Sequence, residues 1–203
     1  MRNAVQMVAV FACLLVGGIG LAADAHDCDT EAAHPSDPDR VGPGKGSGEV
    51  VTDRAISACR RAIDEQPDVA RFHYQLGRAI VYQADANNTD FSKGLTHLQH
   101  AADMKYSQAM FVLGLMHRRA GDICASEPLT KKAADQGLKS ARISYVNAVL
   151  AADYGDCGVS ASVDEMRSYL EGATTQVSGY YENMLLTNLK RDLDTIMPTT
   201  VQE

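Results

Sequence analysis

The nine residues AADMKYSQA at positions 101–109 return as AADQGLKSA at positions 133–141, and this repetition decides the fold. The three alanines and the aspartate keep their places over an offset of 32 residues, whereas the other positions differ. Two shorter matches have similar spacing: Leu76-Gly77 returns as Leu113-Gly114, and Gly121-Asp122 returns as Gly155-Asp156. Periods in the thirties are typical of paired helices that stack into a solenoid.

Helical periodicity and helix-breaking residues outline eight helices from Val50 onward, and no segment predicts a strand. The expected ranges are 52–65, 69–84, 90–104, 107–120, 125–136, 140–153, a helix opening at Ser162, and 177–196. Small residues such as Gly77, Gly114, Ala102 and Ala134 suit positions where antiparallel helices approach within about 8–10 Å. The sequence therefore predicts an all-α fold of about four antiparallel helix hairpins.

The pattern Ala-x-x-x-Leu-Gly-x-x-x-x-x-x-Gly over 109–121, followed by the alanines and glycine of 133–141, resembles the Sel1-like repeat, a relative of the tetratricopeptide repeat. Segments between Cys28 and Ala79 also resemble the region before such repeats in exported alphaproteobacterial proteins. The chain departs from the Sel1 pattern at His117 and Val146. The resemblance implies a right-handed α-α superhelix with repeats over 50–155, capping helices over 156–203, and a scaffold role without shared chemistry.

The N-terminus has the pattern of a signal peptide. Arg2 precedes an apolar stretch from Ala4 to Ala23, and Ala23-Asp24-Ala25 provides the small-x-small pattern that a signal peptidase cleaves. Residues 1–25 are therefore expected to be removed, which directs the chain to the periplasm or outside the cell. Two alternatives are an uncleaved anchor and a lipoprotein at Cys13.

The net charge of −7 is unchanged by this cleavage, which removes one basic and one acidic residue. An acidic surface disfavours nucleic acid and anionic membranes, since both attract basic proteins. No second apolar segment is long enough to span a bilayer. After cleavage, we therefore expect the chain to bind neither nucleic acid nor a membrane. We also expect it to be a monomer.

Four cysteines remain after cleavage, and an even number in an exported chain predicts two disulfides. Sequence permits three pairings, of which the repeat register favours Cys28–Cys59 and Cys124–Cys157. The second pair occupies nearly equivalent turns of successive hairpins. A disulfide that closes a loop of this length should stabilise the folded protein by about 3–4 kcal/mol. Residues 26–49 are rich in Pro, Gly and Asp, so they are expected to form a flexible leader tied down by Cys28.

No motif predicts catalysis, a metal or a cofactor. The glycine-rich stretch 42–48 lacks the Gly-Lys-Ser/Thr ending of a phosphate loop, so a linker is the better interpretation. His97 and His100 share one helical face, but two ligands do not make a zinc site. The chain is therefore expected not to be an enzyme.

A peptide-binding groove is the principal site hypothesis, because the first helix of each hairpin lines the concave face in related folds. The candidates on that face are Arg71, Gln75, Arg78, Tyr82, Arg118, Arg119 and Asn147. Several guanidinium groups on one face suit a carboxylate-bearing partner, since arginine binds carboxylates bidentately. The alternative is that these arginines pair with nearby acids of the chain itself.

The expected function is a periplasmic adaptor that captures another protein or peptide. The alternative from a different class is a cell-envelope protein that binds peptidoglycan fragments or β-lactams. A structural assembly factor without a defined groove ligand is a third interpretation, because a repeat fold does not specify its partner.

Overall fold

The computed structural model describes residues 25–159, 161–176 and 179–196, and these residues form an all-α protein. The predicted signal peptide lies outside the described residues except for Ala25. The helices are α1 (Asp27–Ala32), α2 (Thr52–Glu65), α3 (Ala70–Asn87), α4 (Ser92–Asp103), α5 (Ser107–Arg119), α6 (Ile123–Asp135), α7 (Lys139–Leu150), α8 (Val163–Thr174) and α9 (Tyr180–Ile196), with a 3-10 turn η1 (Ser47–Glu49).

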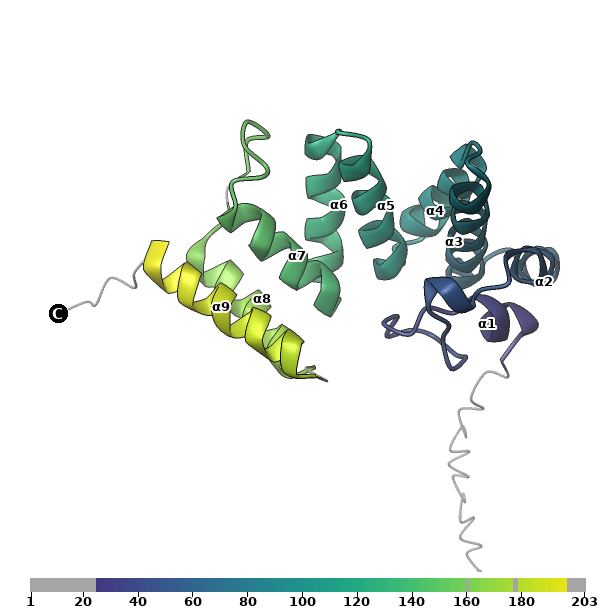
Figure 1. Ribbon diagram of the computed structural model, residues 1–203, viewed down its shortest axis with the longest axis horizontal. Helices are drawn as coiled ribbons and strands as arrows, with labels where there is room; N and C mark the ends of the chain where they lie inside the picture. Colours follow the sequence, from purple (N-terminus) through teal and green to yellow (C-terminus); the bar gives the residue numbers. More distant parts are fainter. Residues whose placement is uncertain (1–24, 160, 177–178, 197–203) are drawn as a thin grey trace, which may run out of the picture.

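The helices follow one another along an arch, with α1 and α2 at one end and α8 and α9 at the other (Figure 1). Each helix packs on the next one in the chain, and two additional contacts join α1 to α3 and α7 to α9. Each of the eight predicted helices is present, as α2 to α9, and their ends lie within a few residues of the predicted ones. Such sequential packing makes neighbouring helices the main source of buried surface.

Glycines in the left-handed backbone conformation follow two helices in the middle of the chain. Gly121 and Gly137 follow α5 and α6 with φ of +82° and +91°, a region in which glycine carries no steric cost. Ser162 caps α8, since its hydroxyl accepts the Glu165 backbone N–H at 3.1 Å. Local sequence therefore fixes where these helices begin and end.

Glycine lets α3 and α4 approach closely. A Cβ at Gly77 would lie 2.8 Å from the Gly94 carbonyl oxygen, and one at Gly94 would lie 2.9 Å from the Gly77 carbonyl oxygen. The same device recurs in the next pair of helices, where a Cβ at Gly114 would lie 2.8 Å from Thr130 Oγ1. The repeated Leu-Gly dipeptides thus mark helix contacts, as predicted.

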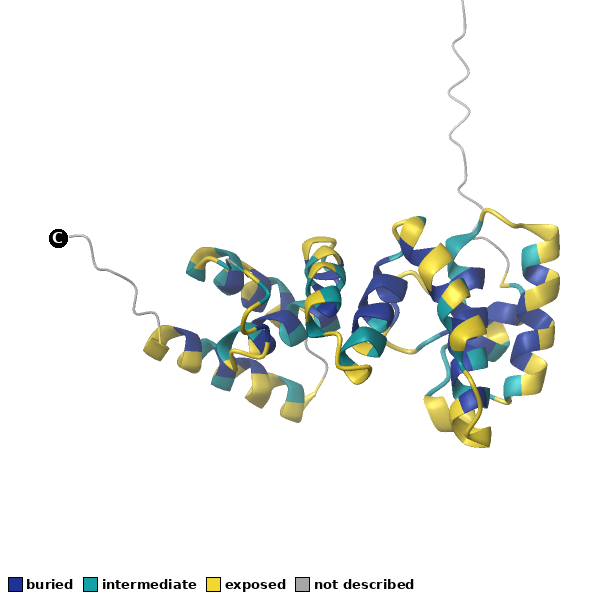
Figure 2. Ribbon diagram, turned by 90° about the horizontal axis from the view of Figure 1, so that it is seen from above, coloured by how far each residue is buried: buried dark blue, intermediate teal, exposed yellow. Residues whose placement is uncertain are grey.

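The buried apolar residues form two clusters, and buried positions occur along the arch from one end to the other (Figure 2). The larger one extends from α3 to α9 and includes Leu98, Phe111, Tyr145 and Leu170. The smaller one joins α1, α2 and the start of α3 around Phe72. The predicted capping helices α8 and α9 therefore share one core with α3 to α7.

Both cysteine pairs lie at disulfide distance, in the pairing that the repeat register favours. Cys28 joins α1 to Cys59 in α2 with a Cα–Cα distance of 4.5 Å. Cys124 joins the start of α6 to Cys157 with a Cα–Cα distance of 5.1 Å. Such pairs indicate an oxidising compartment. No helix in the described part of the chain combines the length and the apolar character needed to cross a membrane.

The leader differs from the prediction of a flexible segment. Residues 27–32 form α1, and Asp29, Ala33 and Asp37 are fully buried. Asp37 accepts a hydrogen bond from the Tyr106 hydroxyl at 2.7 Å, which fixes the leader to the turn between α4 and α5. Long-range polar contacts therefore order a stretch whose composition alone does not predict order.

Candidate functional site

The leader occupies the surface that Arg71 and Gln75 were predicted to offer to a partner. Asp29 of α1 accepts hydrogen bonds from Arg71 Nε at 2.9 Å and Nη2 at 3.3 Å, and from Gln75 Nε2 at 3.0 Å. Gln75 is fully buried. The arginine does bind a carboxylate bidentately, but that carboxylate belongs to the chain itself, so neither residue is available to a partner.

Arg78 is also directed at the leader. Its Nη1 donates to the carbonyl oxygens of Ala32 and Ala33 at 2.8 and 3.0 Å, and its Nη2 donates to the Lys45 carbonyl. Its Nε donates to the Tyr82 hydroxyl at 3.1 Å. The Arg78 side chain therefore holds three backbone carbonyls of the leader, which sequence reasoning did not predict.

Arg118 and Arg119 form ion pairs with acidic residues of the same chain, although they were predicted to line a peptide-binding groove. Arg119 makes two hydrogen bonds to Asp85 at 3.0 and 3.1 Å, and Arg118 pairs with Asp153. The alternative interpretation, pairing with acids of the same chain, therefore describes these residues. Of the seven predicted groove residues, Arg78, Tyr82 and Asn147 line open pockets.

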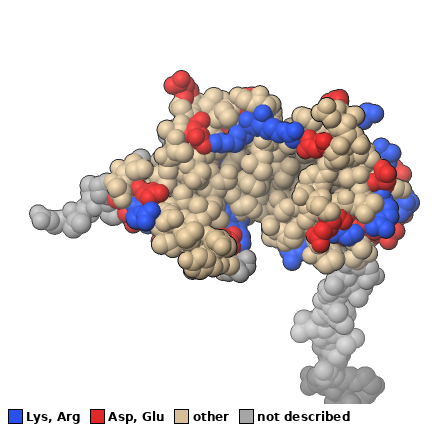
Figure 3. All heavy atoms as spheres, viewed as in Figure 1, with Lys and Arg blue, Asp and Glu red and all other residues tan. Residues whose placement is uncertain are grey.

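A cleft of about 810 Å³ lies between α7, the N-terminal end of α9 and the leader, and is here called the α7–α9 cleft. In Figure 3 a hollow separates the two ends of the arch, and its visible wall is mostly uncharged. The lining residues are Ser36, Lys139, Ser140, Ile143, Ser144, Asn147, Gly179, Tyr180, Tyr181, Glu182 and Leu185.

Large apolar side chains are exposed on the α9 side of this cleft. Tyr180 and Tyr181 are 76% and 79% exposed, and Met184 and Leu185 are also exposed. The opposite face of α9 buries three leucines in the core, so this helix is apolar on two sides. An exposed apolar face on a helix already packed by its other face is typical of a binding surface.

This surface was missed by sequence reasoning, although a signal exists. Residues 180–186 read YYENMLL, which holds more large apolar side chains than one buried face requires. The groove implied by the family resemblance was instead predicted on earlier helices. A comparison of apolar residues with the single core face of α9 would have located the cleft.

A second pocket of about 420 Å³, here called the α3–α5 pocket, adjoins the cleft through Ser36 and Ser140, which line both. Its polar lining includes His34, Tyr74, Arg78 and Gln108. Its apolar lining consists of Val81, Phe111, Val112, Leu115 and Met116. The leader thus forms one wall of both cavities.

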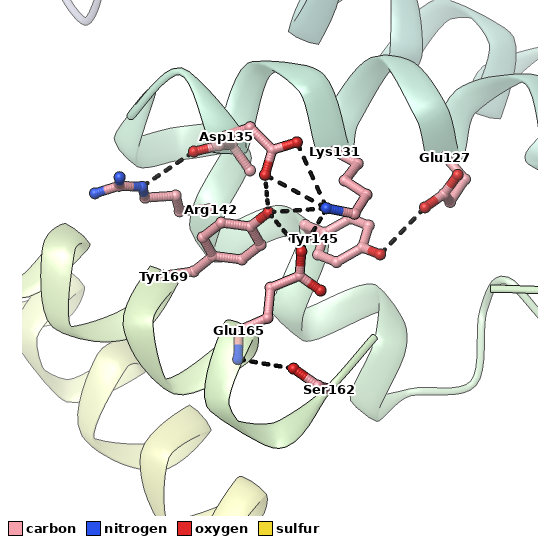
Figure 4. A network of polar contacts seen from close by, with 9 residues as sticks. Glu127, Lys131, Asp135, Arg142, Tyr145, Ser162, Glu165 and Tyr169 are labelled. Atoms are coloured by element: carbon pink, nitrogen blue, oxygen red, sulfur yellow. Dashed lines mark hydrogen bonds and ion pairs between the residues drawn. The ribbon is translucent and has the colours of Figure 1, made fainter. Parts of the chain in front are cut away.

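A polar network around Lys131 joins α6, α7 and α8 (Figure 4). Lys131 contacts Glu165, Asp135 and the Tyr169 hydroxyl, and Tyr169 donates a hydrogen bond to Asp135. Burial lowers the pKa of Lys131, but hydrogen bonds to Glu165 and Tyr169 outweigh it, so the pKa lies above its ordinary value. Burial and the bond to Asp135 raise the pKa of Tyr169 to about 12.

These protonation states decide what the network can do. An ammonium with a raised pKa and a neutral phenol are both poor general bases at neutral pH. The network therefore acts as a link between three helices, with Tyr145 and Tyr169 also lying near the Lys131 ammonium.

Three histidines from α3 and α4 lie close together. The His73 ring lies 4.3 Å from that of His100 and 5.8 Å from that of His97, between ring centroids. Desolvation by burial lowers the pKa of His73 and of His97. Within the described residues, no group of three or more His, Cys, Asp or Glu side chains is arranged to hold a metal ion.

The fold class that these observations define is an all-α protein with two cysteine pairs at disulfide distance and an apolar cleft. No protein-family model matches the chain, and no curated protein matches it at a significant level.

Proposed function

We propose that this chain is an exported interaction scaffold without catalytic activity, in which the α7–α9 cleft captures an apolar segment of another protein. The exposed face of Tyr180, Tyr181 and Leu185 carries the proposal. Aromatic side chains dominate the energy of protein interfaces, because they bury large areas at little entropic cost.

The proposal includes the arrangement of a right-handed superhelix with Sel1-like repeats. Sequential packing of the helices and the close contacts at Gly77 and Gly114 support it. In such a stack the concave side presents side chains from several hairpins to one ligand. Asn147 of α7 then offers an amide donor and acceptor beside the tyrosines, a combination that matches a peptide backbone.

Export is the second part of the proposal. The backbone N–H of His26 donates to Asp29 Oδ2 at 3.0 Å. Cleavage after Ala25 would make this nitrogen the N-terminal ammonium, which strengthens its bond to a buried carboxylate. Mass spectrometry of the N-terminus of the exported protein tests this: a first residue other than His26 contradicts the cleavage site.

Site-specific crosslinking tests the capture of a partner. A photoreactive phenylalanine derivative at Tyr181 should give protein adducts in the cell envelope, whereas the same group at Val41, exposed on the leader, is the matched control. Replacing Tyr180 with alanine should reduce the adducts about tenfold, since one central aromatic residue is worth at least that factor. Equal adducts at both positions would contradict the cleft as an interface.

A peptidoglycan fragment is the second candidate ligand. Ser140, Ser144 and Asn147 add hydroxyl and amide groups to the aromatic lining, and that mixture also suits a sugar with a short peptide. Stoichiometric binding of a purified muropeptide that the Tyr181→Ala variant loses would favour this candidate over a protein partner.

A further inference from the structure

The α3–α5 pocket contains a buried positive charge that no acid of the described chain neutralises. Arg78 is only 3% exposed, and its four hydrogen bonds go to three carbonyls and one phenol. None of the ion pairs among the described residues includes Arg78. Burying a guanidinium is costly unless an anion accompanies it, so the pocket favours an anionic ligand.

Two further polar atoms beside Arg78 are buried without a hydrogen-bond partner in the described protein. They are the Tyr74 hydroxyl and Gln108 Oε1, on side chains that are 0% and 3% exposed. Burial raises the pKa of the Tyr74 hydroxyl and a weak hydrogen bond with Gln108 opposes that rise, but the two side chains do not meet in good hydrogen-bond geometry. An unsatisfied buried hydroxyl destabilises the folded protein, so a bound ligand that accepts its hydrogen bond would recover that loss.

Two further side chains of the pocket, Tyr82 and His34, can each donate a hydrogen bond. The Tyr82 hydroxyl accepts from Arg78 and keeps its own hydrogen for a further acceptor. His34 Nδ1 accepts the Ser36 N–H at 3.1 Å, and burial followed by the Arg78 charge lowers the His34 pKa to about 4. The ring is therefore neutral with its hydrogen on Nε2. Three neutral donors beside one guanidinium are complementary to a carboxylate.

The remainder of the pocket is apolar. Phe111, Val112, Leu115 and Met116 of α5 form its wall, and Leu115 is 40% exposed. Asp85, the acidic lining residue, is exposed and already bonded to Arg119. The pocket volume of about 420 Å³ lies within the range of small-molecule sites.

We propose that the α3–α5 pocket binds a small monocarboxylate with an apolar tail. The carboxylate is held by Arg78 with the hydroxyls of Tyr74 and Tyr82, and the tail lies along the apolar wall of α5. The ligand source is either an acyl chain or an acylated amino acid, which share this chemistry. The site is separate from the tyrosines of the α7–α9 cleft, so the inference does not depend on the proposed scaffold role.

Titration calorimetry of the oxidised full-length mature chain tests the proposal with octanoate, octanamide and N-acetyl-leucine as probes. We expect at least one carboxylate to bind and octanamide to bind at least tenfold more weakly, because the charged acceptor is lost. Preference for octanoate indicates an acyl chain, and preference for N-acetyl-leucine indicates an acylated amino acid. Failure of both carboxylates to bind, or equal affinity for octanoate and octanamide, overturns the proposal.

The Tyr74→Phe variant separates a ligand role from a structural one. It should weaken carboxylate binding about tenfold and leave the melting temperature unchanged or higher, because it removes an unsatisfied buried hydroxyl. Tyr145→Phe, the same change in another hairpin, is the matched control and should bind normally. Leu115→Asp provides a second, exposed substitution that should abolish binding. Wild-type affinity in both Tyr74→Phe and Leu115→Asp overturns the assignment.

Discussion

The two ends of the arch use their surface side chains in opposite ways. At the N-terminal end, Arg71 and Gln75 are engaged by the leader, so this part of the polar face of α3 is covered by the chain itself. At the C-terminal end, Tyr180 and Tyr181 remain exposed beside an open cleft. The polar side chains of α3 and the aromatic side chains of α9 thus differ in availability, because another segment of the chain covers the former and leaves the latter exposed.

The cysteine pairs differ in the same sense. Cys28 and Cys59 are fully buried and hold α1 against α2, whereas Cys124 is exposed and its bridge joins the start of α6 to the segment after α7. The closed loops are nearly equal, with sequence separations of 31 and 33 residues. Any difference between the bridges must therefore come from the contacts that each one holds in place.

Removal of the N-terminal bridge should have the largest effect. The double substitution Cys28→Ala with Cys59→Ala should lower the free energy of unfolding by at least about 3–4 kcal/mol, the loop-closure value. The matched pair Cys124→Ala with Cys157→Ala should lose about that value and no more, because few buried contacts depend on it. Urea unfolding followed by circular dichroism measures both, and an equal loss would break the comparison.

The carboxylate that holds the leader should have the next largest effect. Asp29→Asn leaves Arg71 partly buried without its anion, so we expect a loss of about 2–3 kcal/mol in unfolding free energy. Asp85→Asn, which breaks the exposed pair with Arg119, should change stability little. The two variants are compared by the same urea titration. A stable Asp29→Asn protein would show that the leader contributes little.

The sequence predicted the eight helices from 52 to 196 well, because their signals are local. Periodicity, the capping serine at 162 and the glycines at 121 and 137 lie within a few residues of what they determine. The Leu-Gly dipeptides likewise predicted close helix contacts that the structure contains.

The tie at Cys28 was predicted, but the helix and the buried carboxylates of the leader were not, because their contacts involve distant residues. Asp29 and Arg71 are 42 positions apart, and Asp37 and Tyr106 are 69 apart, so no local pattern links them. The same contacts explain why Arg71 does not line a peptide-binding groove. Arginine was correctly predicted to bind a carboxylate, but that carboxylate is Asp29 of the same chain. The cleft beside Tyr181 depends on how α7 and α9 pack, which sequence periodicity does not define.

Alanine substitutions at two glycines should differ in their cost to stability, and this difference should be the next largest effect. A Cβ at Gly77 meets the Gly94 carbonyl oxygen at 2.8 Å, whereas a Cβ at Gly172 meets the end of the flexible Arg142 side chain. Gly77→Ala should therefore cost about 1–3 kcal/mol of unfolding free energy. Gly172→Ala should be nearly neutral, because the guanidinium can move and alanine favours helix. Thermal unfolding of both variants tests this, and an equal cost would contradict it.

Mild acid should produce the smallest effect and should act on the N-terminal half first. The six histidines of the chain all lie between residues 26 and 117. Burial lowers the pKa of His73 and His97, and each is lowered further by the neighbouring histidines of their cluster. The Pro67 carbonyl and Asp68 oppose this at His73, whereas Arg60 adds to it at His97.

A histidine whose pKa is lower in the folded state than in the unfolded state binds its proton preferentially after unfolding. Stability is therefore complete above the unfolded pKa of about 6.5 and falls as the pH decreases towards the folded value, about 4 for His34. Between pH 7 and pH 5.5 we expect a loss on the order of 1 kcal/mol. Amide hydrogen exchange, corrected for the intrinsic rate, should show faster exchange at pH 5.5 in α3 and α4 than in α8 and α9. The His97→Gln variant should reduce that difference, and uniform exchange across both halves would show that the two ends of the arch unfold as one unit.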